Sequence, residues 1–148
     1  MSFRKIAGLF LLAACSSATR NASTDGQLTG APAPKVAVEQ FLSAVNAKDL
    51  QAMSTVFGTK NGSARETMDH TELEKREVIL ACYFSHDSSR ILGETQGIQN
   101  HRDIRVELKK GNFTRQTTFY TIKGPGDRWY VDNMDIASVR DFCGNPGN

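Results

Sequence analysis

Few side chains of this 148-residue chain could carry acid–base chemistry, and they are widely spaced. His101 stands just before a predicted strand, and an imidazole titrates near neutral pH. The carboxylates of Asp132 and Asp135 lie on a later predicted strand. Tyr83 and Tyr120 could donate hydrogen bonds from a pocket wall or pack in the core as amphipathic side chains. No spacing among these residues defines a catalytic motif, and a loop histidine with surface carboxylates explains them as well, so the sequence assigns no catalytic residue.

The sequence predicts no metal site and no bound cofactor. The histidines His70, His86 and His101 are far apart, and spacings typical of zinc ligands, such as Cys-x-x-Cys, do not occur. The chain also lacks a phosphate-binding glycine loop and a dinucleotide fingerprint. The 18 Lys and Arg barely exceed the 16 Asp and Glu and form no basic stripe, which argues against a nucleic acid partner.

Cys15 is the cysteine with the clearest chemical context. The segment before it begins with the positive residues Arg4 and Lys5 and continues with a seven-residue apolar core, Ile6–Leu12. Such a core is too short to span a bilayer, which takes about 20 residues, but it is typical of an export signal. The residues Leu12-Ala13-Ala14-Cys15 resemble the lipobox of bacterial lipoproteins.

That resemblance implies a membrane-anchored lipoprotein with residues 1–14 as its signal peptide. It implies cleavage after Ala14, a diacylglyceryl group on the Cys15 sulfur, and an acyl chain such as palmitate on the new amino group. The mature chain would carry no net charge, because Arg4 and Lys5 leave with the signal. Ser16, where Asp favours retention in the inner membrane of enterobacteria, implies the outer membrane facing the periplasm. The alternative is an ordinary signal peptide that ends at a chance cysteine.

The two remaining cysteines, Cys82 and Cys143, leave two interpretations open. An even pair in an oxidising compartment favours a disulfide, which would tie the C-terminal tail to a predicted helix. Cys82 also lies in an apolar run, Val78–Phe84, where a free cysteine behaves as a small buried hydrophobic residue.

The elements that would position these residues change type midway along the chain. Residues 15–34 are mostly small, polar, Gly and Pro, which predicts a flexible tether behind the lipid anchor. Apolar residues then recur at helical spacing, and after His86 they alternate as in strands. The charged run Glu72–Glu77 is typical of a solvated helix face. We expect helices over 35–46, 50–57 and 72–84, and strands over 90–97, 103–109, 113–123 and 128–137. Asp49 should cap the second helix. The third helix should begin with a capping box, Thr71-Glu72-Leu73-Glu74, and its apolar second half should be buried.

Helices followed by strands with tight turns predict an α+β fold, with the N-terminal helices packed on a curved antiparallel sheet. The domain would span residues 35–143, with 144–148 as a tail. A helix pair broken at Lys48-Asp49, a third helix, and a meander ending in Asp127-Arg128-Trp129-Tyr130-Val131 resemble the nuclear transport factor 2-like superfamily, a cystatin-like cone.

The resemblance to that superfamily implies three alternative functions, and the fold alone does not choose among them. The domain could bind a small apolar ligand or a protein partner without catalysis, which the missing catalytic set favours. It could be a proton-transfer enzyme like ketosteroid isomerase or scytalone dehydratase. Such an enzyme needs a pocket of roughly 300 Å³. An interior filled by Phe41, Phe119 and Trp129 would exclude this alternative. It could also assemble as a homodimer through its open sheet face.

Overall fold

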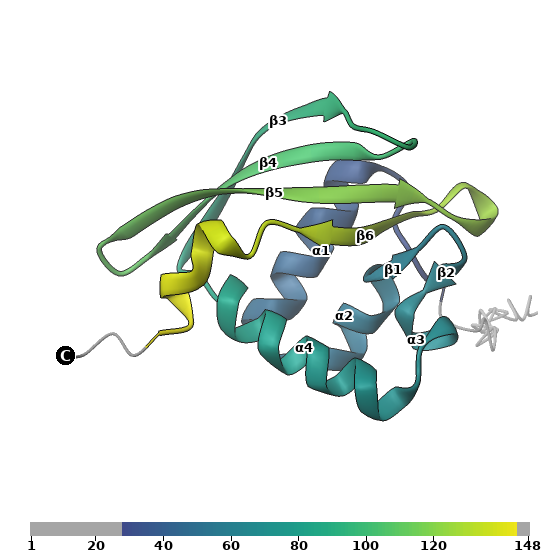
Figure 1. Cartoon of the computed structure of the whole chain (residues 1–148), viewed down its shortest axis with the longest axis horizontal. Coiled ribbons are helices and arrows are strands. Elements are labelled where there is room, and N and C mark those ends of the chain that lie inside the picture. Colours follow the sequence, from purple (N-terminus) through teal and green to yellow (C-terminus); the bar gives the residue numbers. More distant parts are fainter. Residues whose placement is uncertain (1–27, 145–148) are drawn as a thin grey trace, which may run out of the picture.

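The computed structural model describes residues 28–144. The predicted signal peptide, Cys15, most of the predicted tether and residues 145–148 of the predicted tail lie outside the described residues. Figure 1 shows a sheet that lies across a layer of helices, with the helices on one of its faces. Between residues 28 and 144, no helix has both the length and the apolar character needed to cross a bilayer. The elements are α1 (Pro34–Ala47), α2 (Leu50–Val56), β1 (Gly58–Thr59), β2 (Gly62–Ser63), α3 (Ala64–Thr67), α4 (His70–Phe84), β3 (Ser88–Gln96), β4 (Arg102–Lys110), β5 (Phe113–Lys123), η1 (Pro125–Asp127), β6 (Trp129–Met134) and η2 (Ala137–Phe142).

The first two helices lie within one residue of their expected bounds. Pro34 begins α1, where its missing N–H costs little. Lys48 adopts a left-handed conformation (φ 54°), and its N–H donates to the Val45 carbonyl, which ends the helix. Asp49 then caps α2, because its side chain accepts a hydrogen bond from the Ala52 N–H at 2.9 Å.

The start of α4 differs from the prediction. Its N-cap is Asp69, whose carboxylate accepts a hydrogen bond from the Glu72 N–H at 3.0 Å, so the helix begins at His70. The expected capping box at Thr71 is therefore wrong. Asp is the stronger N-cap residue and comes two positions earlier in the chain.

One stripe of α4 faces the core. Val78 and Ile79 lie outside it and are 55% and 54% exposed. The prediction of a helix end buried all round is therefore wrong, because a helix that packs on one side buries one face. Glu77 lies within the stripe and is only 3% exposed, so the prediction of a fully solvated charged run is wrong as well. The buried stripe consists of Leu73, Glu77, Leu80 and Phe84.

The four long strands follow one another in an antiparallel meander, in the order β3-β4-β5-β6. On β4, Ile104, Val106 and Leu108 alternate with polar residues and are fully buried. Phe119 of β5 and Val131 of β6 are fully buried too. The predicted α+β class, with helices followed by an antiparallel sheet, is confirmed.

β6 ends at Met134, three residues before the expected end. Asp135 accepts hydrogen bonds from the backbone N–H and the hydroxyl of Ser138. This turn leads the chain into η2 and away from the ladder with β5.

The last residues of the predicted tether are part of the folded domain. Ala31 forms an antiparallel bridge with Trp129, with N–H···O distances of 2.8 Å in both directions. The N–H of Gly30 donates to the Thr55 carbonyl at 2.7 Å, and the Arg128 guanidinium donates to the Gly30 carbonyl at 2.6 Å. Any flexible segment therefore ends before these residues.

Three fully buried phenylalanines join the helices to the sheet. The ring centroid of Phe41 lies 6.3 Å from that of Phe84 and 5.9 Å from that of Phe119, and the latter two are 5.0 Å apart. Phe57 lies beside Phe41 at 6.4 Å. Trp129 does not take part in this cluster. It is half-buried at the edge of the domain, with the Lys123 ammonium 5.4 Å from its ring.

Candidate functional site

The structure brings three of the sequence candidates together in one open groove. His101, Asp132 and Tyr120 line a groove of about 720 Å³, together with Asp103, which the sequence did not single out. Asp103 lies opposite Tyr120 in the β4–β5 ladder, and the β5–β6 register shifts beside Tyr120, at Asp132. This bulge changes the alternation that would otherwise place Asp132.

The other two candidates lie elsewhere. Tyr83 is half-buried and packs against the core, which agrees with its interpretation as an amphipathic core side chain. Asp135 is used in the turn after β6, where it binds Ser138.

A tight loop between β3 and β4 fixes the backbone of His101. The Gly97 N–H donates to the His101 carbonyl at 2.9 Å, and the His101 N–H donates to the Ile98 carbonyl at 3.0 Å. Gly97 lies close to Asp103, since an added Cβ would be 2.2 Å from the Asp103 carboxylate and that side chain would have to move. The loop thus brings an imidazole and a carboxylate to one side of the groove.

Both ring nitrogens of His101 are hydrogen-bonded. Nδ1 lies 2.9 Å from the Ile98 carbonyl oxygen, and Nε2 lies 2.6 Å from Oδ2 of Asp132. Because a carbonyl and an ionised carboxylate only accept hydrogen bonds, this geometry favours the protonated ring, in which both nitrogens donate. Burial lowers the pKa of His101, but the bonds to Asp132 and Ile98 and the charges of Asp132 and Asp103 outweigh it and raise the pKa above its usual value.

This geometry gives His101 the role of a clamp. A general base needs a free lone pair within reach of the substrate proton, and neither nitrogen offers one. The ion pair instead fastens the β3–β4 loop to β6.

We expect Asp132→Asn to lower the pKa of His101 and to weaken the fold in a pH-dependent way. Because the folded pKa is raised, the pair stabilises the fold fully below the unfolded pKa of about 6.5, and this stabilisation is lost as pH rises through the folded pKa. The substitution should cost about 1–2 kcal/mol at pH 6 and much less at pH 9. Urea unfolding at both pH values, with NMR titration of the imidazole, measures this.

Asp127→Asn is the matched control, because that carboxylate is exposed and is 3.6 Å from the Lys123 ammonium. It should leave the His101 titration unchanged. An equal loss of stability at pH 6 and pH 9 for Asp132→Asn would contradict the clamp.

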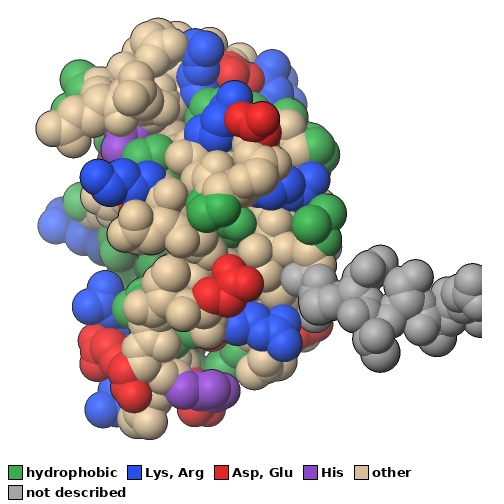
Figure 2. Space-filling model, turned by 90° about the vertical axis from the view of Figure 1, so that its right-hand side faces the viewer, with side chains coloured by type: hydrophobic (Ala, Val, Ile, Leu, Met, Phe, Trp, Pro, Cys, Tyr) green, Lys and Arg blue, Asp and Glu red, His purple; other side chains and the backbone are tan. Residues whose placement is uncertain are grey.

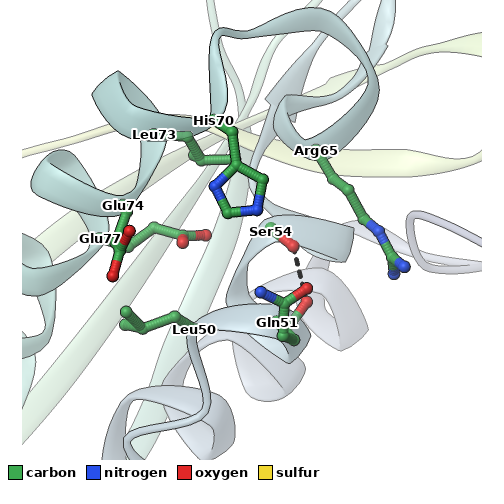
Figure 3. Close-up of a pocket in the computed structure, with 8 residues that line it drawn as sticks. All are labelled: Leu50, Gln51, Ser54, Arg65, His70, Leu73, Glu74 and Glu77. Carbon is green, nitrogen blue, oxygen red and sulfur yellow. Dashed lines mark hydrogen bonds between the residues drawn. The ribbon is translucent and has the colours of Figure 1, made fainter.

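A second, smaller cavity lies between α2, α3 and α4 and was not expected from the sequence. Its volume is about 100 Å³, and Figure 3 shows the Glu77 carboxyl group directed into it from α4, toward His70 and Ser54. Oε1 of Glu77 is buried and has no hydrogen-bond partner among the described residues. An unpaired buried acceptor costs about 1–3 kcal/mol, so this position is not explained by stability.

The surroundings of Glu77 change its protonation. Loss of solvation by burial, and then the negative charge of Glu74, raise the pKa of Glu77 to about 7. The group thus holds a proton for part of the time at neutral pH. Perturbed carboxyl groups in cavities are candidates for binding or proton transfer.

The burial of Glu77 can be predicted from the sequence, but only from its helical spacing relative to apolar residues. Glu77 is the fourth residue after Leu73 and the third before Leu80, which places it on the core-facing stripe. The neighbouring charges Glu74, Lys75 and Arg76 are exposed. The whole charged run is therefore predicted to be solvated unless each residue is assigned to its own face of the helix.

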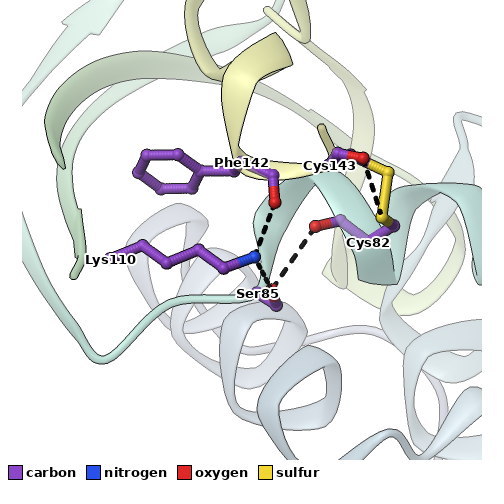
Figure 4. Close-up of a disulfide and its surroundings, with 5 residues drawn as sticks. All are labelled: Cys82, Ser85, Lys110, Phe142 and Cys143. Carbon is purple, nitrogen blue, oxygen red and sulfur yellow. Dashed lines mark hydrogen bonds between the residues drawn. A yellow bond between two sulfur atoms is a disulfide. The ribbon is translucent and has the colours of Figure 1, made fainter. Parts of the chain in front are cut away.

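The two cysteines left open by the sequence form a disulfide. Cys82 of α4 and Cys143 after η2 have Cα atoms 5.0 Å apart, and their sulfur atoms are bonded. Figure 4 shows the Lys110 ammonium between Ser85 and Phe142, where it donates to the Ser85 hydroxyl and to the Phe142 carbonyl, both at 2.6 Å. The C-terminal segment is therefore held to α4 by a covalent bond and to β4 by a charged hydrogen bond.

Among residues 28–144, no cluster of three or more His, Cys, Asp or Glu side chains could hold a metal ion. Comparisons of the chain with protein-family models, curated proteins and solved structures gave no match. The arguments for a function therefore rest on the residues described above.

Proposed function

We propose that the chain is a lipid-anchored lipoprotein of the bacterial cell envelope whose domain, of the nuclear transport factor 2-like type, binds a ligand or partner without catalysis. The observation that carries the anchor is the position of Cys15, directly after Leu12-Ala13-Ala14 and a short apolar core. Two or three acyl chains would hold such a protein stably at a membrane. Ser16 favours the outer membrane, with the domain in the periplasm.

The disulfide supports an oxidising compartment. Such bonds persist in the periplasm and are rare in the reducing cytosol. The bond between Cys82 and Cys143 therefore agrees with export.

Two observations favour binding over catalysis. The buried rings of Phe41, Phe84 and Phe119 fill the space between helices and sheet where an enzyme of this superfamily would need its pocket. In the outer groove, which is large enough for a substrate, both nitrogens of His101 are already engaged.

The alternative of a dimer through the open sheet face is less well supported. On β4, the residues that point away from the helices are Asp103, Arg105, Glu107 and Lys109, a mixed charged set. Figure 2 views another side of the molecule and shows positive and negative side chains interspersed there too. A stable dimer interface needs a larger apolar centre than β4 offers on this face.

The anchor is tested by growing cells that produce the chain with labelled palmitate. We expect the wild-type chain to incorporate the label and to fractionate with membranes. Cys15→Ala should lose the label completely and remain as an uncleaved precursor, because the acylated sulfur is required before cleavage. Cys82→Ala is the matched control and should keep the label. A wild-type chain that is unlabelled and free of membranes would overturn the proposal.

A further inference from the structure

We propose that the cavity at Glu77 binds the ammonium group of a small primary amine. The inference deepens the proposed function, because it takes the domain to be a binding module and names the chemistry of its ligand. It does not depend on the lipid anchor.

Two of the side chains that line the cavity, Glu77 and Ser54, present hydrogen-bond acceptors to it. Oε1 of Glu77 is buried, has no hydrogen-bond partner within residues 28–144, and belongs to a carboxyl group that is directed into the cavity. The Ser54 hydroxyl donates its proton to the Gln51 carbonyl at 2.7 Å, so toward the cavity its oxygen can only accept. A ligand that fits these atoms must bring donors, and a primary ammonium brings three N–H groups on one atom.

The charges around the cavity favour a cation. Glu77 and Glu74 of α4 are both at the cavity, and their mutual repulsion is one cause of the raised pKa of Glu77. The other titratable groups that line it are His70 of α4 and Arg65 of α3, while α2 contributes none. Figure 3 shows the Arg65 guanidinium directed away from the two carboxyl groups. An anion would meet two carboxylates, whereas an ammonium would relieve their repulsion.

The size and walls of the cavity limit the rest of the ligand. A volume of about 100 Å³ holds roughly three water molecules or an equal number of other heavy atoms. Leu50 and Leu73 supply apolar walls that would contact a short alkyl chain. Ethylammonium, with one nitrogen and two carbons, is therefore the probe that matches the site.

Binding should be coupled to the protonation of Glu77. A bound ammonium pairs with the carboxylate and competes with the proton. With a pKa of about 7 for Glu77, the fraction of free sites that are ionised rises about tenfold from pH 6 to pH 8. Ethylammonium stays charged over this range, since alkylamines such as the lysine side chain titrate near pH 10.

The experiment is an NMR titration of the full chain, as isolated from cells in detergent, with ethylammonium chloride. Sodium chloride at equal ionic strength and ethanol, which lacks the charge, serve as ligand controls. We expect a dissociation constant on the order of 1 mM at pH 8, the limit for three heavy atoms, and about tenfold weaker binding at pH 6. The shifts should map to the residues of α2 and α4 that line the cavity.

Glu77→Gln keeps the size of the side chain and removes its charge, so it should weaken binding at least tenfold at pH 8 and abolish the pH dependence. Glu39→Gln, an exposed carboxylate on α1, is the matched control and should bind as the wild type does. Equal binding by Glu77→Gln would overturn the inference. If that variant does not fold, the pH dependence of the wild type decides, and binding that is independent of pH, or shifts that sodium chloride reproduces, would overturn it too.

A primary ammonium could come from a free amine or from the ethanolamine headgroup of a phospholipid. Glycerophosphoethanolamine, the soluble form of that headgroup, separates these sources. Tighter binding of this probe than of ethylammonium assigns the site to the lipid headgroup, and weaker binding assigns it to a free amine. Palmitate labelling at Cys15 and this titration can fail independently, so failure of one is not mistaken for failure of the other.

Discussion

Replacing both Cys82 and Cys143 with serine is expected to lower the free energy of unfolding by about 4 kcal/mol. The two residues are 61 positions apart, and all four strands of the meander lie in the closed loop. The bond removes much of the freedom of this loop in the unfolded chain, and in the chain-entropy account that constraint is the main source of the stabilisation. Without it, η2 would be held to α4 and β5 by packing and hydrogen bonds alone.

Urea unfolding of the oxidised wild type and of the double variant measures this effect. The wild type unfolded in the presence of a reducing agent should match the variant, which separates loss of the bond from any effect of the serines. Ser85→Ala, which removes a partner of Lys110 but keeps the disulfide, is the control and should cost about 1 kcal/mol. A loss below about 1 kcal/mol in the double variant would show that the bond does not constrain the domain.

Phe41→Ala should destabilise the domain by about 3–5 kcal/mol. Phe41 is fully buried in the middle of α1 and contacts Phe84 of α4 and Phe119 of β5. Its removal would leave a cavity where the helices meet the sheet, and rings held by three separate elements cannot all move in to fill it. The expected loss is a large share of the 5–15 kcal/mol typical of a domain.

Phe113→Ala is the matched control, because this ring lies at the start of β5 and is 41% exposed. It stacks on the Arg115 guanidinium, with 5.1 Å between the guanidinium carbon and the ring centroid, so its loss should cost below about 1 kcal/mol. Thermal and urea unfolding of both variants would test the comparison. Similar losses for the two residues would mean that the aromatic cluster does not join the layers.

Local patterns predicted most of the secondary structure. The helical spacing of Val38, Phe41, Leu42 and Val45 and the alternation around Val106 depend only on neighbours in the chain, and both elements occur as expected. The start of α4 differs from the prediction because Asp69 and Thr71 can both cap a helix, and the structure uses Asp69, the stronger cap. The docking of Ala31 on Trp129 has no local signal, since nearly a hundred residues separate the partners.

The candidate sites show the same limit more sharply. The sequence indicates His101 and Asp132 separately, but their contact depends on a bulge in β6 that no sequence spacing reveals. Glu77 lies in a run of exposed charges of both signs on the same helix, so its burial is not evident from the charge pattern alone. The pairing of Cys82 with Cys143 required the distance between two segments, which sequence separation does not give.

The docking of Gly30 and Ala31 on the domain would limit how far from a bilayer a protein anchored at Cys15 could work. If Cys15 carries the lipid, 15 peptide steps join the membrane surface to Gly30. A fully extended chain spans about 3.5 Å per residue, so Gly30 would lie at most about 50 Å from the membrane surface. With that anchor, the domain would sample only a thin layer next to its own membrane and would not reach across a wide compartment. Its targets would have to lie in, or come to, that layer.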